Sequence, residues 1–281
     1  MRELGDPEGG IAGNPVDIDI AIGLAEQFEA EEGGNGQFRL GLVENRCKSG
    51  TVMQETEART GQRQLFATRH RISAIQTVVV SGVAMVVIVA SSVTAADGSV
   101  APWEESVLLF FNGWYDWLEP PMWVLQQVGV IGTPIVVALI VYYFTRRWQY
   151  LVAFAAILPL KLVIEKGVVK KLVERDRPFE SVGPHINVRG PAFEGLSFPS
   201  GHATTVFAVG ILLAVLLPSR WRPVPVVWAG VVAIARLYYG EHNFLDVVAG
   251  AAIGTLFAVL LWYVLLNRVV DDQPEDVVAG P

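Results

Sequence analysis

Apolar segments long enough to cross a lipid bilayer recur along the last three quarters of the chain. A spanning helix needs about 20 consecutive, mostly apolar residues, and a window of that length finds six candidates. They cover residues 74–95, 124–145, 150–170, 200–217, 224–240 and 247–266. The sequence therefore predicts an all-α protein built as a six-transmembrane-helix bundle.

The connection between the first two segments carries a helical pattern of its own, in which apolar side chains recur at helical spacing and polar ones lie largely opposite. The apolar set is Trp103, Val107, Phe110, Phe111, Trp114 and Leu118, and the polar set is Glu104, Glu105, Asn112 and Asp116. The pattern predicts an amphipathic helix lying in the membrane interface. A loop helix packed on the bundle fits the same pattern equally well.

The positions of the arginines predict the orientation of the segments. Seven arginines fall in the N-terminal flank, the second and fourth loops and the C-terminal flank, which the positive-inside rule assigns to the cytoplasm. These residues are Arg69, Arg71, Arg146, Arg147, Arg220, Arg222 and Arg268. Both termini are therefore expected in the cytoplasm. The first outer loop, residues 97–121, has five acidic residues and no Lys or Arg, as an outward segment should.

The third connection departs from this distribution of charge. Residues 166–189 contain six basic side chains on the predicted outer side, where the orientation rule alone disfavours them. Charged groups at or near membrane depth are costly unless they are paired or hydrated, and they tend to mark functional sites. We therefore expect these cations to face an anion.

Composition separates the N-terminal stretch from the rest of the chain. The 281 residues are 52% hydrophobic and 17% charged, with a mean hydropathy of +0.42, which is too apolar for one soluble domain. Residues 1–66 are instead acidic, rich in Gly and Glu and without a sustained apolar period, so we expect a disordered tail. Its start lacks a signal-peptide pattern, and Met53 is a second candidate start. The single cysteine, Cys47, excludes an internal disulfide or a Cys-based metal site.

Three polar stretches fall on the predicted outer side. The first runs from Lys170 to Pro178, the second is the tetrapeptide at residues 199–202, and the third runs from Arg236 to Asp246. Each has an ordinary structural explanation when it is taken alone: flanking cations that reach the interface, a helix N-cap, and a pair of residues four apart at a helix start.

Taken together, the three stretches resemble the signature of the type 2 phosphatidic acid phosphatase superfamily, which is K-x6-RP, then PSGH, then SR-x5-H-x3-D. The matching positions are Lys170, Arg177 and Pro178, then Pro199, Ser200, Gly201 and His202, then Arg236, His242 and Asp246. One departure is visible, because Ala235 stands where the family usually has Ser. The resemblance implies a membrane phosphatase domain over residues 67–268, followed by a cytoplasmic tail over residues 269–281.

Phosphoryl transfer explains why these residue types occur together. The transition state spreads negative charge over three equatorial oxygens, which fixed cations and backbone donors stabilise. Phosphate-binding roles therefore fall to three cations and to the amides at the start of the fourth segment. These residues are Lys170, Arg177, Arg236, Ser200 and Gly201. We expect the side chains to converge on one cavity that encloses a single phosphoryl group.

The two histidines of the signature divide the proton and phosphoryl chemistry between them. Asp246 follows His242 by one helical turn and can hold its Nδ1 proton, which leaves Nε2 free to attack phosphorus. His202 is then the general acid that protonates the leaving group. The resemblance implies the same catalytic residues, and it implies that no metal ion or other cofactor is needed.

These observations predict an integral membrane hydrolase that releases phosphate from a lipid phosphate or pyrophosphate through a phosphohistidine intermediate, with its active site on the outer face. Polyprenyl pyrophosphates such as undecaprenyl pyrophosphate, phosphatidylglycerol phosphate and phosphatidic acid all carry suitable head groups. A bacterial plasma membrane and a role in the cell envelope are expected, with the bilayer and the lipid as partners and no nucleic acid. A lipid phosphotransferase with an acceptor other than water is one alternative, and a non-catalytic lipid-binding or transport protein is another.

Overall fold

The computed structural model describes residues 71–190 and 195–271, which form helices and no β-strand. The predicted tail of residues 1–66, with the alternative start at Met53, lies outside the described residues, as does most of the predicted tail of residues 269–281. The helices in chain order are α3 (Ala74–Ala95), α4 (Pro102–Asn112), α5 (Glu119–Gln126), α6 (Thr133–Thr145), α7 (Trp148–Ala155), α8 (Ile157–Lys161), α9 (Lys170–Val173), α10 (Pro178–Ser181), α11 (Gly201–Leu216), α12 (Pro223–Tyr238), α13 (Phe244–Leu261) and α14 (Asn267–Asp271).

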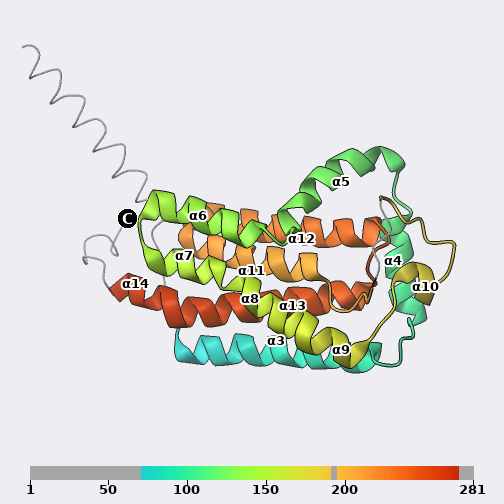
Figure 1. The fold of residues 1–281 in the computed structure, drawn as a ribbon, viewed down its shortest axis with the longest axis horizontal. Coiled ribbons are helices and arrows are strands. Elements are labelled where there is room, and N and C mark those ends of the chain that lie inside the picture. The colour runs from blue at the N-terminus through green and yellow to red at the C-terminus, as the bar shows by residue number, and fades with distance from the viewer. Residues whose placement is uncertain (1–70, 191–194, 272–281) are drawn as a thin grey trace, which may run out of the picture. The chain divides into compact units, whose positions relative to one another are not determined.

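The long helices run side by side as a bundle, with α4, α9 and α10 at one end and α14 at the other (Figure 1). Helices cover all six predicted segments. Two of them are long and apolar enough to cross a membrane, α3 and the continuous helix Phe244–Val269, and a bent pair, Asp116–Gly129 with Thr133–Thr145, makes a third candidate. α11 is a shorter apolar helix.

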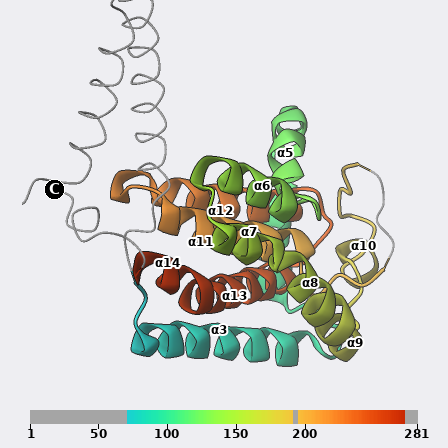
Figure 2. The ribbon, with the colours of Figure 1, turned by 60° about the vertical axis from the view of Figure 1, so that its left-hand side comes forward.

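α3 illustrates how the bundle meets lipid. Ser73 begins the helix with a reciprocal cap, in which its hydroxyl accepts from the Gln76 amide at 3.1 Å and its own amide donates to the Gln76 side chain at 3.0 Å. α3 then packs along α13, as Figure 2 also shows. Its opposite side exposes aliphatic residues such as Ile75 and Val86, which suits contact with acyl chains.

The predicted segment at residues 124–145 is bent and does not form one continuous helix. α5 with its 3₁₀ extension Gln127–Gly129 meets α6 at an angle of 70°. Pro134 explains the break, because a proline has no amide for an intrahelical bond and favours the first turn of a new helix. The next segment is also subdivided, since Pro159 cannot donate to the carbonyl of residue 155, where α7 ends, and a π-helical stretch, Leu162–Val169, separates α8 from α9.

The helix predicted after α3 is present as α4, and it packs on the bundle, which is the second of the two placements expected from the sequence. Glu104 and Asn112 are buried in the protein, while Trp103 and Phe110 are exposed. α4 packs on α12 and α13, because its two buried polar side chains have bonding partners there. The expected continuation of this helix through Leu118 is replaced by a turn and a short 3₁₀ segment, Asp116–Leu118.

The contact between α11 and α13 places the start of α11 against the start of α13. A Cβ atom on Gly250 would lie 2.4 Å from the carbonyl oxygen of Ser200, and one on Gly254 would lie 2.4 Å from that of Thr204. Two glycines one turn apart therefore let the backbones approach closely, as small residues do between membrane helices. The Ser200 amide also donates to the Asp246 carbonyl at 2.9 Å.

We predict that Gly254→Ala lowers the free energy of unfolding by about 1–3 kcal/mol, the usual cost of overpacking a tight contact. Gly230→Ala is the matched control, because no atom lies within 4 Å of the new Cβ on α12 and alanine favours the helix. Thermal unfolding of the purified proteins in detergent measures both. Equal unfolding temperatures for the two variants would contradict the tight contact.

Candidate active site

A cavity lies at the end of the bundle where α11 and α13 begin. Its volume is about 1030 Å³, at the upper end of the roughly 300–1,000 Å³ typical of small-molecule sites. Six of the eight predicted site residues line it, namely Lys170, Arg177, Gly201, His202, Arg236 and His242. The other two, Ser200 and Asp246, are fully buried next to these residues. The cavity is larger than the enclosure for one phosphoryl group expected from the sequence, so it has room for more of a head group.

Two of the cations of the first stretch, Lys170 and Arg177, hold the loop that leads to α11. Lys170 begins α9 and donates from Nζ to the Leu196 carbonyl at 2.7 Å. Arg177 precedes α10 and donates from Nε to the Gly195 carbonyl at 3.0 Å. Its Nη1 donates to the Glu241 carbonyl at 2.9 Å. Both cations therefore line the cavity and fix neighbouring backbone segments.

The start of α11 has the features of an anion site, but a carboxylate already lies close to it. Ser200 is the N-cap residue, with extended backbone and a buried hydroxyl that has no hydrogen-bond partner. A Cβ atom on Gly201 would lie 2.7 Å from Oε1 of Glu165. A helix N-terminus favours negative charge, which suits both this buried carboxylate and a phosphate in the cavity.

Arg236 reaches the cavity from the last turn of α12. It is almost fully buried, and it pairs with the Glu241 carboxylate and donates to the side-chain oxygen of Gln126. Pairing makes the burial of this charge tolerable. The neighbouring Ala235 packs with Met122, Tyr238 and Tyr239 and does not line the cavity. The absence of the serine hydroxyl usual in the family therefore does not change the residues that line the cavity.

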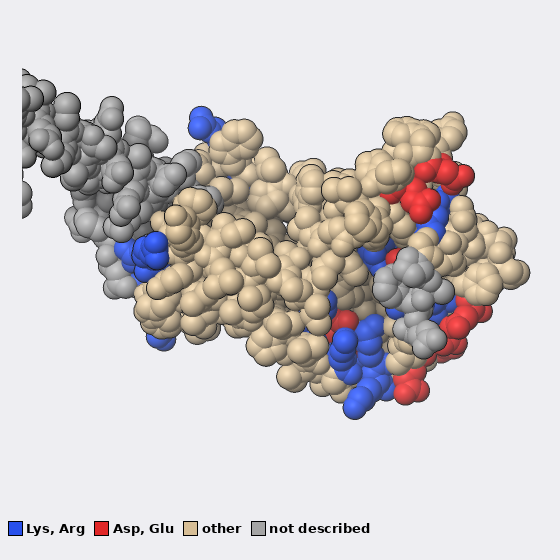
Figure 3. All heavy atoms as spheres, turned by 45° about the horizontal axis from the view of Figure 1, so that its top comes forward, with Lys and Arg blue, Asp and Glu red and all other residues tan. Residues whose placement is uncertain are grey.

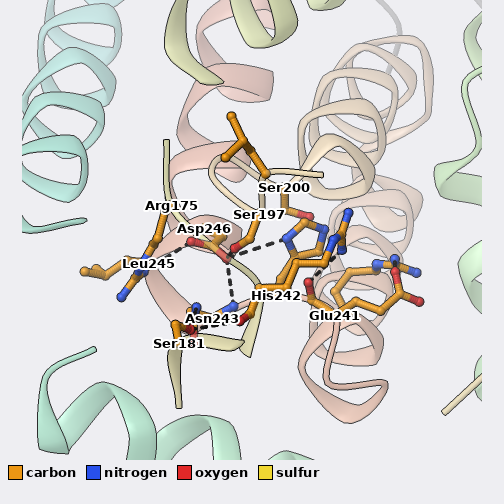
Figure 4. Close-up of polar contacts among 12 residues, drawn as sticks. Arg175, Ser181, Ser197, Ser200, Glu241, His242, Asn243, Leu245 and Asp246 are labelled. Carbon is orange, nitrogen blue, oxygen red and sulfur yellow. Dashed lines mark hydrogen bonds and ion pairs between the residues drawn. The ribbon is translucent and has the colours of Figure 1, made fainter. Parts of the chain in front are cut away.

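The imidazoles of His202 and His242 come to the cavity from different elements. His202 lies in the first turn of α11 and packs against Gly129, where a Cβ atom would lie 2.5 Å from its Cδ2. His242 lies between α12 and α13, and its Nδ1 is 3.6 Å from Oδ2 of Asp246 (Figure 4). That separation is longer than a hydrogen bond, but catalytic contacts often tighten only when substrate binds.

Burial dominates the titration of His242. It lowers the pKa of the imidazole to about 4, the neighbouring Asp246 opposes this shift, and the Arg236 guanidinium adds to it. The neutral form therefore prevails at pH 7. A neutral imidazole is the form that can attack phosphorus.

Several polar residues at this site were not predicted from sequence. Ser197 donates its hydroxyl to Oδ2 of Asp246, and Lys161 donates to Thr205 at 2.9 Å. Arg175 binds both Glu104 and Asp246. The one available signal was position, since Ser197 lies three residues before Ser200 and Arg175 lies between Lys170 and Arg177.

Within residues 71–190 and 195–271, no group of three or more His, Cys, Asp or Glu side chains is arranged to hold a metal ion.

On the face drawn in Figure 3, charged side chains gather at the two ends of the bundle, and the surface between them is almost free of charge. Such a band suits the hydrocarbon core of a bilayer.

Comparison with known proteins gives consistent relatives. The family model described as PAP2 superfamily matches residues 146–269. The lipid A 4'-phosphatase of Bacteroides thetaiotaomicron is 31% identical over 188 residues, which cover 61% of this chain and 82% of that protein. The decaprenylphosphoryl-5-phosphoribose phosphatase of Mycobacterium tuberculosis is 30% identical over 138 residues, or 49% of this chain and 68% of that protein.

A solved structure shares the fold. The crystal structure of the first transmembrane PAP2 type phosphatidylglycerolphosphate phosphatase from Bacillus subtilis superposes with a TM-score of 0.50 and 22% identity, and the match covers 66% of this chain and 93% of that one. The shared fold and the long apolar helices are those of a helical integral membrane protein. The chain belongs to the PAP2 superfamily, as the three sequence stretches predict.

Gly129→Ala tests the position of His202. The added methyl group displaces the imidazole from its place against the 3₁₀ turn, so we predict a fall in kcat of at least about tenfold, because the general-acid role expected for His202 from the sequence contributes about 10²–10⁴ to rate. Gly132→Ala is the control, since no atom lies within 4 Å of its new Cβ, and it should retain wild-type kcat. Phosphate release by the purified variants decides between these outcomes, and equal rates would contradict the placement of His202.

Proposed function

We propose that the protein hydrolyses the phosphate or pyrophosphate group of a membrane lipid through a phosphohistidine intermediate. The observation that carries the proposal is the convergence of Lys170, Arg177, Arg236, His202 and His242 on one cavity, with Asp246 buried next to His242. Seven Lys or Arg side chains and three Glu side chains line the cavity, so its lining is cationic on balance. The named relatives, which are phosphatases of lipid A and of a decaprenyl-linked phosphoribose, support the same substrate class.

The reaction has two steps. Nε2 of His242 attacks phosphorus while the ester oxygen leaves and takes a proton from His202, and the new N–P bond replaces the broken O–P bond. The Asp246 carboxylate holds the Nδ1 proton and balances the positive charge on the imidazole ring. Water then attacks the phosphohistidine, His202 accepts its proton, and the N–P bond breaks to release phosphate. The three cations stabilise the charge on the equatorial oxygens in both steps.

The orientation that suits this reaction has six spans, with both termini in the cytoplasm and the cavity near the outer face. Helix α10 and the connection between α12 and α13 lie at one end of the bundle, and the turn between α6 and α7 and helix α14 lie at the other (Figure 1). Arg146, Arg147 and Arg268 are at that second end. This distribution agrees with the positive-inside rule.

Replacing the nucleophile tests the proposal. His242→Ala should abolish release of phosphate from lipid substrates, because no other described imidazole in the cavity has a carboxylate placed behind it. His185→Ala is the control, since His185 is exposed and pairs with Glu105 away from the cavity. The assay presents polyprenyl pyrophosphate, phosphatidylglycerol phosphate, phosphatidic acid and a polyprenyl-linked sugar phosphate to each purified protein.

The same assay separates the competing functions. Equal turnover by His242→Ala and wild type would exclude the mechanism, and no phosphate release from any lipid by wild type would favour a binding or transport protein. Transfer of the phosphoryl group to an added alcohol, without free phosphate, would identify a phosphotransferase.

The pKa of His242 predicts the acid side of the pH profile. Below a pKa of about 4 the imidazole gains a proton and cannot attack, so kcat/KM should stay constant down to about pH 5 and fall about tenfold per unit below the pKa. The measurement is the pH dependence of kcat/KM, corrected for the second ionisation of the substrate phosphate, near pH 6. If the acid limb of the corrected kcat/KM profile has its midpoint near pH 6.5, the pKa of His242 is not lowered and the prediction is wrong.

A further inference from the structure

Arg175 is a buried cation that the reaction described above does not use. Its side chain is fully buried and, unlike Lys170 and Arg177 on either side, it does not line the cavity. Nη1 and Nη2 donate to the two carboxylate oxygens of Glu104 at 2.9 and 2.7 Å. Nη1 also donates to Oδ1 of Asp246 at 3.2 Å, and Nη2 to the Ser99 carbonyl at 2.8 Å. One guanidinium therefore joins the segment before α4, α4 itself and α13.

Asp246 is held by contacts to both of its oxygens. Oδ1 accepts from Arg175, while Oδ2 accepts from the Asn243 amide at 2.8 Å and from the Ser197 hydroxyl. Only Oδ2 also faces His242 (Figure 4). Fixing Oδ1 on the opposite side prevents the carboxylate from rotating, so that Oδ2 stays directed at Nδ1.

Glu104 extends this arrangement to the backbone of α13. Its Oε1 accepts both from Arg175 and from the Leu245 amide, the latter at 2.8 Å. The Leu245 amide is in the first turn of α13, where backbone donors have no partner inside the helix. Glu104 therefore fixes the helix start that carries Asp246.

The charges of the buried cluster also matter to the reaction. Glu104 and Asp246 contribute two negative charges and Arg175 one positive charge, so the cluster carries a net charge of minus one. Burial alone would lower the pKa of Arg175, but its hydrogen bonds to Glu104 and the two carboxylate charges outweigh burial and raise it, so Arg175 stays charged. A net charge of minus one stabilises the imidazole ring when it becomes cationic on attacking phosphorus.

We propose that Arg175 and Glu104 are positioning residues that fix the orientation of Asp246 and set the charge of its surroundings, so that Asp246 can hold the Nδ1 proton of His242. The inference rests on the proposed function, since it assigns these residues to the support of the proposed nucleophile. Neither residue touches the cavity or the substrate.

The first test separates turnover from binding. Arg175→Gln and Glu104→Gln should each lower kcat about ten- to hundredfold, the loss that follows when the hydrogen-bond partner of a metal-ligating side chain is removed, because Asp246 is likewise a supporting group that these contacts hold in place. KM should change less than about threefold, because the cations that line the cavity are unaltered. Glu105→Gln is the matched control, since Glu105 is the next residue on α4 and pairs only with the exposed His185 in the described structure.

The second test uses the pH profile, which a purely structural role would leave unchanged. The other charged or titratable groups that act on His242 are Asp246 on α13, Arg236 on α12, His202 on α11 and Arg177 before α10. Arg175→Gln makes the cluster of Arg175, Glu104 and Asp246 more negative, which raises the pKa of His242 and should shift the acid limb of the kcat/KM profile to higher pH by about one unit. Glu104→Gln makes the cluster neutral and should shift the limb to lower pH.

The double variant Glu104→Gln with Arg175→Gln restores the net charge of minus one, so its acid limb should return to the wild-type position although kcat stays low. It also removes the buried Glu104 carboxylate that Arg175→Gln alone would leave without its cation, which is the main risk to folding of that single variant. Arg175→Lys keeps the charge without the two-pronged contact to Glu104, so it should show the wild-type limb with a reduced kcat.

Labelling distinguishes the inference from the function on which it rests. Wild-type protein mixed briefly with a ³²P-labelled lipid phosphate should carry label on His242, and the variants should acquire it more slowly. If wild type carries the label but the variants acquire it at the same rate with coincident pH profiles, the positioning role is overturned. A rise in KM with unchanged kcat would also overturn it. If wild type carries no label on His242, the proposed mechanism itself fails.

Discussion

The burial of the Asp246 carboxylate is the constraint on which the arrangement of the site depends. A charged group removed from water is costly unless hydrogen bonds and opposite charge surround it. Here the contacts come from three separate parts of the chain: Arg175, Ser197, and the neighbouring residues His242, at longer range, and Asn243, through its amide. Satisfying one carboxylate therefore joins the first and third sequence stretches to the segment just before the second.

The packing of the helices also places the site residues beside one another. The tight approach of α11 to α13 at Gly250 and Gly254 holds Ser200 and His202 beside the start of α13. α4 crosses the end of the bundle and presents Glu104 inward, toward Arg175 and the Leu245 amide. The polar groups are thus concentrated at one end of an otherwise apolar bundle, where a lipid head group meets water while its chains remain in the bilayer.

Much of this organisation follows from the sequence. Hydropathy locates the helices, and the spacing of Lys170, Arg177, His202, Arg236 and His242 selects residues that line one cavity. Periodicity shows which residues share a side of a helix, but it does not show which side faces the protein. The pattern places Glu104 opposite the apolar residues of its helix, but it does not reveal that Glu104 is buried, because its partner Arg175 lies 71 residues away. The 70° bend before α6 was missed because hydropathy averages over the proline that causes it.

The central claim is that one phosphoryl group contacts both histidines and the three cations at once. A structure of the protein with orthovanadate, an analogue of the transition state that should bind more tightly than substrate, tests this directly. The account predicts vanadium within bonding distance of Nε2 of His242, with its oxygens in contact with Lys170, Arg177 and Arg236 and with His202 next to the apical oxygen. Vanadate bound elsewhere, or in the cavity without contact to His242, would contradict the account.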